Sequence, residues 1–368
     1  MASIGALLPG LLACVLVATV ARFVGTALQL GLETAVALAI GLAVGSVPAV
    51  RSVLVTGAGL AARFALRVGI TLLGARLTVG QLIETGGASV LAVVAIVTVG
   101  LLLGTVLARR LGVQPPLSAL ISVGMAICGN SAILALAPIL RAPHRETAYA
   151  VSTITSFGLI GVLLLPVLGR ALGLPDGVFG TWAGLSVNDT AQVVATGYAF
   201  SPPAGDVATV VKLTRNLAIL PVLLGATWLA VRHAAANAAD AADATEEDAP
   251  TGMVTAASPL RLVARAVPWF VIGFVVFAAL RSAGLLDGVL PSGGTLADLC
   301  STAATLLILV ALAGVGISTD IRAMLGVGAR PFLLGASIWV VLVLLGLGLA
   351  TVVAGAAGPA ATAVYHVG

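Results

Sequence analysis

The string ICGNSAI (residues 127–133) interrupts a long apolar run, and SVNDTAQVV (186–194) interrupts another. A third polar string, VVKLTRNL (210–217), follows and contains Lys212, the single lysine of the chain. Unpaired polar groups are costly in hydrocarbon, so they lie where they bind one another, water or cargo. These strings therefore predict a membrane protein with a polar site inside the bilayer.

The sequence around these strings is far too apolar for a soluble protein. Hydrophobic residues make up 60% of the chain, charged residues 9%, and the mean hydropathy is +1.17. Soluble domains carry about 25% charged residues. The apolar runs have the length of transmembrane helices and are too long and too evenly apolar for barrel strands. The composition predicts an all-α polytopic membrane protein of about 10–11 transmembrane helices.

Eleven apolar runs are candidate spans, and several are short or interrupted. They lie near 4–21, 35–50, 64–80, 88–108, 117–140, 147–169, 179–200, 207–231, 262–280, 297–318 and 331–355. The first run lacks a basic segment before it and a convincing cleavage site. We therefore expect it to be a retained span and not a signal peptide.

The distribution of arginines predicts the orientation, because cytoplasmic loops are enriched in basic residues. With a cytoplasmic N-terminus and an external C-terminus, ten loop arginines lie inside and four outside. The inside set is Arg51, Arg63, Arg109, Arg110, Arg170, Arg232, Arg261, Arg265, Arg322 and Arg330. The outside set is Arg22, Arg141, Arg145 and Arg281. Because Arg141 and Arg145 follow ICGNSAI closely, we expect that helix not to cross in the ordinary way.

One linker divides the chain, at residues 233–258, which are rich in alanine and acidic residues and contain proline and glycine. This composition predicts a disordered cytoplasmic loop. Residues 1–232 and 259–368 then form the two parts of one integral transport domain, with the polar strings in the first part.

Two features indicate an internal repeat. LLGARLTVGQL (72–82) and LAGVGISTDIRAML (312–325) are each an apolar run, a glycine-containing turn and a polar start to the next element. Asn130-Ser131-Ala132 also resembles part of Asn188-Asp189-Thr190-Ala191. Paired interruptions are typical of transporters with inverted repeats and broken helices crossing near the midplane. Eleven runs do not divide into equal halves, so an extra span or a permuted repeat is needed.

The string ICGNSAI has the residue types of an anion site. Gly129 permits a break in the helix, and Asn130 and Ser131 offer donors and acceptors. A helix that restarts after the break would direct backbone N–H groups at a bound anion. The alternative is that both polar side chains only hydrogen-bond a neighbouring helix.

In SVNDTAQVV the central residue is Asp189, the carboxylate most plausibly at membrane depth. It could couple transport to H⁺ or Na⁺, or it could be a structural ion-pair partner of Lys212 or Arg215. Its polar neighbours are candidate substrate-binding residues, namely Asn188, Thr190 and Gln192.

In VVKLTRNL, Lys212 and Arg215 are three residues apart and share a helix face, with Asn216 one turn from Lys212. We interpret the three as a buried anion clamp, in which arginine gives bidentate recognition and lysine a point charge. The alternative is snorkelling to the interface. Arg67 and Arg76 are weaker candidates for the same cavity.

The sequence argues against an enzyme, a metal or cofactor protein and a nucleic-acid-binding protein. There is no catalytic triad or metal-ligand spacing, so we expect no enzyme, cofactor or metal site. Cys14, Cys128 and Cys300 stand far apart in apolar surroundings and are interpreted as core thiols. The arginines form no basic stripe, which argues against nucleic acid.

ICGNSAI, VVKLTRNL, LLGARLT and WAGLSVNDTAQVVATG (182–197) resemble the sulfate exporter family of bacterial inner-membrane proteins, also called the YeiH family. That family belongs to the bile acid, arsenite and riboflavin transporter superfamily. The resemblance implies inverted repeats, crossed broken helices, and secondary transport of a small inorganic or organic anion, with export of sulfate or a sulfonate. The alternative is a passive anion channel, which would show a ring of similar polar residues and need no carboxylate. Besides the anion and the lipid bilayer, a second copy of the chain is a candidate partner.

Overall fold

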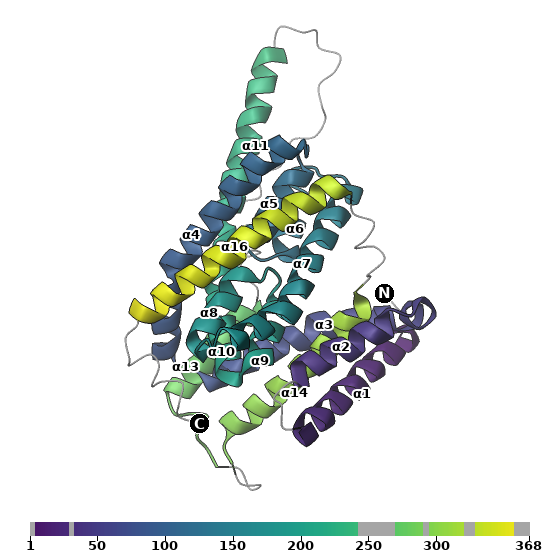
Figure 1. Ribbon diagram of the computed structural model, residues 1–368, viewed down its shortest axis with the longest axis vertical. Helices are drawn as coiled ribbons and strands as arrows, with labels where there is room; N and C mark the ends of the chain where they lie inside the picture. The colour runs from purple at the N-terminus through teal and green to yellow at the C-terminus, as the bar shows by residue number, and fades with distance from the viewer. Residues whose placement is uncertain (1–3, 29–32, 242–268, 290–293, 320–327, 357–368) are drawn as a thin grey trace.

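The computed structural model describes residues 4–28, 33–241, 269–289, 294–319 and 328–356 (Figure 1). Its regular elements there are all helices, and one isolated bridge pairs Val289 with Thr295. This confirms the all-α prediction.

Within the described residues, seven helical segments are long and apolar enough to span a membrane, which confirms a polytopic protein. They are α1 (Ile4–Leu28), α3 (Pro48–Leu73), α4 (Val79–Leu111), α7 (His144–Ala171), α10 (Pro202–Leu217) continued by α11 (Ile219–Ala241), α14 (Leu296–Ser318) and α16 (Ala329–Ala356). The shorter helices are α2 (Glu33–Gly45), η1 (Gly74–Arg76), α5 (Leu117–Ala126), α6 (Asn130–Leu136), α8 (Asp176–Ser186), α9 (Thr190–Phe200) and α13 (Trp269–Ser282).

The third predicted span, 64–80, was placed too late in the chain. Pro48 begins α3, where its missing N–H costs no hydrogen bond, and the helix ends at Leu73. Arg51 and Arg63 therefore lie inside a helix and not in loops as predicted. The orientation stays a prediction of the arginine distribution.

The predicted disordered loop at 233–258 is also corrected in part. Helix α11 continues to Ala241, so residues 233–241 are helical. This part of the chain is rich in alanine, the strongest helix former. Residues 242–258 lie outside the described residues.

Helices α1, α2, α3, α13 and α14 pack into a first bundle, much of it visible at the lower right of Figure 1. Small residues allow close approach of the backbones. Gly41 and Gly45 of α2 lie directly against the carbonyl groups of Ala313 and Ile317 of α14, where a side chain would collide. Such small-residue contacts are the usual means of packing helices in lipid.

Helices α4 to α10 and α16 form a second bundle. Its core contains Trp182 of α8, whose indole Nε1 donates to the carbonyl of Val343 in α16 at 2.8 Å. Phe179 stacks on Phe200 with ring centroids 4.0 Å apart, which joins α8 to the end of α9. The second bundle meets the first mainly through α9, which packs against α2 and α14.

The two suspected repeat motifs each begin at the end of a long helix of the first bundle, α3 and α14. The first joins α3 to α4, and the second begins in α14 and precedes α16. Helix α3 packs on α14, and α4 packs on α16. The broken segment α5–α6 follows α4, but the broken segment α8–α9 comes before α16. The internal repeat therefore stays a prediction.

Candidate functional site: two crossed broken helices

The first break separates α5 from α6 at Gly129. Its φ of 63° and ψ of −125° are a backbone conformation that favours glycine. A Cβ atom at this position would also lie 3.3 Å from backbone atoms of Asn188 and Asp189. Glycine is needed at this break because of its backbone angles and because a second chain segment passes so closely.

The second break separates α8 from α9 and lies against the first. Val187 and Asp189 have extended backbones, which end α8 at Ser186 and allow α9 to begin at Thr190. We call residues 126–130 and 186–190 the crossing. The C-terminal ends of α5 and α8 and the N-terminal ends of α6 and α9 all meet there.

Lys212 of α10 reaches the crossing and is fully buried. Its ammonium group donates to the carbonyl of Ile127 at 2.8 Å, that of Val187 at 3.2 Å and that of Asn188. These three acceptors match the three donors of a lysine.

Arg215, one turn further along α10, is also fully buried. Its Nε donates to the carbonyl of Ala126 at 2.9 Å, and its Nη1 to that of Leu185 at 2.7 Å. Nη1 also bonds Val187 at 3.2 Å, and Nη2 bonds the carbonyl of Met125. The last carbonyls of a helix lack internal partners and carry partial negative charge. Arg215 and Lys212 therefore cap the ends of both α5 and α8.

These contacts correct the interpretation of the cation pair. Snorkelling is wrong, because neither side chain is exposed to any degree, at 0%. The anion-clamp interpretation assumed that both side chains donate hydrogen bonds directly to the anion. In the structure, they donate to backbone carbonyls instead. Both cations hold the broken helices in place and add positive charge to the crossing.

Asp189 lies at the opposite, N-terminal side of the crossing. Its Oδ1 accepts from the backbone N–H of Ala191 at 2.9 Å and so caps α9. Its Oδ2 accepts from Asn130 Nδ2 at 3.4 Å. Among the ion pairs of the described residues none involves Asp189, so the predicted structural pair with Lys212 or Arg215 is not formed.

Four amide side chains near the crossing have a buried oxygen that accepts no hydrogen bond within the described structure. They are Asn130, Asn188, Gln192 and Asn216. The amide nitrogen of Gln192 donates to the carbonyl of Thr155 at 3.1 Å, which fixes the direction of the group. That of Asn188 points to the sulfur of Met125 at 3.0 Å. Buried polar atoms without a partner call for an explanation, such as a bound ion or water.

The structure brings most of the predicted site residues together. Thr190 is half-buried and accepts from Asn216 at 3.5 Å, while Ser131 is exposed in the first turn of α6. Sequence reasoning missed Thr155 of α7, whose hydroxyl accepts from Asn130 at 3.5 Å. The signal was the polar stretch STITS (152–156) inside an apolar span.

The remaining residues singled out in the sequence, two arginines and three cysteines, have different surroundings. Arg67 is exposed on α3, and Arg76 lies in a separate network at the junction of the bundles. All three cysteines are free: Cys14 and Cys128 are buried, which confirms them as core thiols, while Cys300 is half-buried.

Seven long apolar helices and two crossed broken helices define a polytopic helical membrane protein with a polar site in its interior. A family model, Conserved hypothetical protein 698, matches residues 9–335, and the chain belongs to this family. A UPF0324 membrane protein of Clostridium tetani is 31% identical over 295 residues, covering 80% of this chain and 82% of the relative. One of Streptococcus agalactiae is 30% identical over 348 residues, covering 92% and 96%. No solved structure matches the chain significantly.

Proposed function

We propose that this protein is a secondary transporter, and not an enzyme, that moves a small sulfate- or sulfonate-like anion outward across a bacterial inner membrane by alternating access. The crossing is the observation that supports this proposal most strongly. In many secondary transporters, discontinuous helices form the substrate-binding site. The names of the relatives say only that they are membrane proteins, so the substrate rests on the resemblance of the sequence strings and on the charges of the site.

The charges at the crossing favour an anion. The crossing has two cationic side chains, Lys212 and Arg215, and one carboxylate, Asp189. The net charge of these three groups is therefore positive. The two cations also compensate the negative ends of α5 and α8. At the N-terminal side, Asp189 caps α9, while the positive end of α6 remains for an oxyanion, with Ser131 and Thr190 in the first turns of the two helices. We therefore place the substrate on the N-terminal side of the crossing.

Asp189 supplies the coupling, because its negative charge opposes an anion at the same side of the crossing until a cation neutralises it. Four buried amide oxygens without donors lie near it, at Asn130, Asn188, Gln192 and Asn216. Neutral and charged oxygen atoms are the ligands that hard cations prefer. A coupling proton would bind to the carboxylate of Asp189 alone, and the four amide oxygens would still have no partner. We therefore propose Na⁺ as the coupling ion.

Flux into proteoliposomes tests the proposal. Labelled sulfate, sulfite and taurine are offered to purified protein and to protein-free liposomes, with unlabelled anion trapped inside. We expect saturable uptake of at least one anion that is accelerated by the trapped anion, since a carrier exchanges faster than it returns empty. Uptake that neither saturates nor responds to trapped anion would indicate the channel. Uptake no greater than in protein-free liposomes, for all three anions, contradicts the proposed substrate class.

A further inference from the structure

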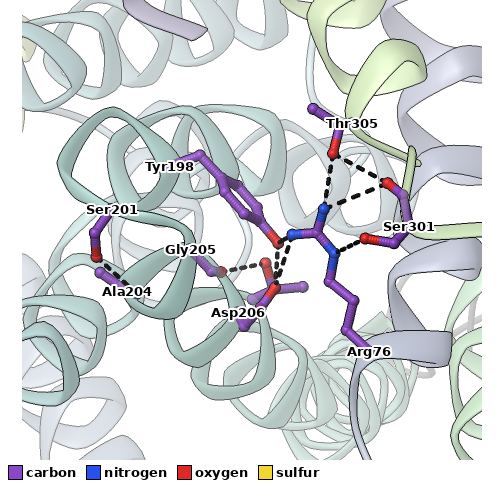
Figure 2. A network of polar contacts seen from close by, with 9 residues as sticks. Arg76, Tyr198, Ser201, Ala204, Gly205, Asp206, Ser301 and Thr305 are labelled. Atoms are coloured by element: carbon purple, nitrogen blue, oxygen red, sulfur yellow. Dashed lines mark hydrogen bonds and ion pairs between the residues drawn. The ribbon is translucent and has the colours of Figure 1, made fainter. Parts of the chain in front are cut away.

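A second polar network lies away from the crossing, where the two bundles meet (Figure 2). Its centre is Arg76 of η1, which joins α3 to α4. The Nε of Arg76 donates to the hydroxyl of Ser301 at 2.7 Å. Its Nη2 donates to the hydroxyl of Thr305 at 2.7 Å and to the Ser301 carbonyl at 3.3 Å. Nε and Nη2 of the guanidinium thus hydrogen-bond to α14, within the first bundle.

The third nitrogen of the guanidinium, Nη1, faces the second bundle. Arg76 Nη1 donates to the hydroxyl of Tyr198 on α9 at 3.3 Å and lies 3.6 Å from Oδ1 of Asp206 on α10. Tyr198 in turn donates to Asp206. Gly205 makes room for the tyrosine ring, since a Cβ there would lie 2.5 Å from the ring carbons.

Each half of this network keeps hydrogen bonds of its own when the other is removed. Arg76 keeps its three contacts to α14 if the bundles part, and Asp206 keeps the Tyr198 hydroxyl. The side chains of Arg76 and Asp206 are 19% and 16% exposed, so water can replace the contact between them. Lys212 and Arg215 differ, because they are fully buried and bond within one bundle. Among the described ion pairs, Arg76–Asp206 is the one that joins the bundles.

Helix α9 connects this network to the crossing. Asp189 caps its N-terminal end, and Tyr198 lies in its last turn. At 1.5 Å per residue the two positions are about 13 Å apart along the helix axis. Arg170 donates to the carbonyl of Ala199 at 2.6 Å and so fixes the other end of the helix. Because this contact ties the end of α9 to α7, Tyr198 moves with the second bundle when that bundle shifts relative to α14.

We propose that Arg76, Tyr198 and Asp206 form a latch that holds the two bundles in the arrangement seen and opens once in each transport cycle. The latch rests on the proposed function, because alternating access requires one bundle to move relative to the other. When the halves part, each charged group keeps hydrogen bonds of its own and can be hydrated, because both side chains are partly exposed.

A cysteine reporter tests the latch without any substrate. Ala195, 1% exposed, lies on the face of α9 that carries Tyr198, in an apolar cluster with residues of α14. Ala195→Cys is introduced after Cys14, Cys128 and Cys300 are each replaced by alanine. The rate of its reaction with N-ethylmaleimide is then measured with Arg76→Gln or Asp206→Asn added. We expect both to accelerate labelling about tenfold, which corresponds to about 1.4 kcal/mol in the opening equilibrium.

Arg281→Gln is the matched control, because it removes the exposed ion pair with Asp287 inside the first bundle. It should leave the labelling rate unchanged. If either main variant fails to fold, Tyr198→Phe decides, since it keeps the ring and removes only the hydroxyl. Unchanged labelling in the folded variants overturns the latch, whether or not the protein transports anions. Accelerated labelling with no anion flux supports the latch and counts against the proposed function alone.

Discussion

At the scale of single residues, Lys212 and Arg215 show how a buried charge can serve structure and function together. Each would be prohibitively costly in hydrocarbon, but the carbonyl ends of two half-helices supply both with acceptors. The charges cannot be removed without leaving these carbonyls unsatisfied. The pair therefore stabilises the break that makes the site.

We predict that Arg215→Ala lowers the stability of the protein, in addition to any loss of anion binding. Several buried carbonyls lose their donor, and loss of hydrogen bonds to a charged group costs about 1.5–3 kcal/mol each. Thermal unfolding in detergent should show a clearly lower midpoint. Arg281→Gln, which removes an exposed arginine, should leave the midpoint nearly unchanged. An Arg215→Ala protein as stable as wild type would contradict the capping role.

At the scale of elements, the break at Gly129 is the most sensitive point of the fold. We predict that Gly129→Ala destabilises the protein and abolishes flux, because the added methyl group meets the backbone of Asn188 at 3.3 Å in a strained conformation. Gly173→Ala is the matched control, because Gly173 has a φ of 61° and nothing within 4 Å of its Cβ position. Equal unfolding midpoints for the two variants would contradict this prediction. They would show that the close approach at the crossing adds no destabilisation to that of the backbone angle.

The sequence indicates the elements well where composition alone decides them. The apolar runs correspond to the helices, and the polar strings mark both breaks. The beginning of α3 was missed because Arg51 and Arg63 resemble loop residues, yet they lie on a helix. The extension of α11 was missed because an alanine-rich polar segment has no apolar periodicity. The partners of Lys212 could not be predicted, because backbone carbonyls carry no sequence signal.

At the scale of the whole molecule, α3 packs on α14 in the first bundle and α4 packs on α16 in the second. Residues far apart in the sequence, such as Arg76 and Asp206, thus meet at the boundary between bundles. No spacing rule applied to one linear segment could have placed them together.

The orientation of the molecule is a prediction of the arginine bias. A cysteine placed at Ala249, in the segment after α11, should react in whole cells only with a membrane-permeant thiol reagent. The native cysteines are replaced by alanine beforehand, so that the introduced residue gives the signal. Labelling by an impermeant reagent would reverse the assigned orientation.

We propose above that the crossing couples an anion to Na⁺ through Asp189. The most direct measurement compares anion flux in proteoliposomes for wild type, Asp189→Asn and the exposed control Asp287→Asn, with Na⁺ and pH gradients imposed separately. Asparagine can still accept the N–H of Ala191 but has no charge for a cation. We predict Na⁺-gradient-dependent flux in wild type and control, and anion binding without Na⁺ dependence in Asp189→Asn. Flux by Asp189→Asn that follows the Na⁺ gradient as in wild type would contradict the account.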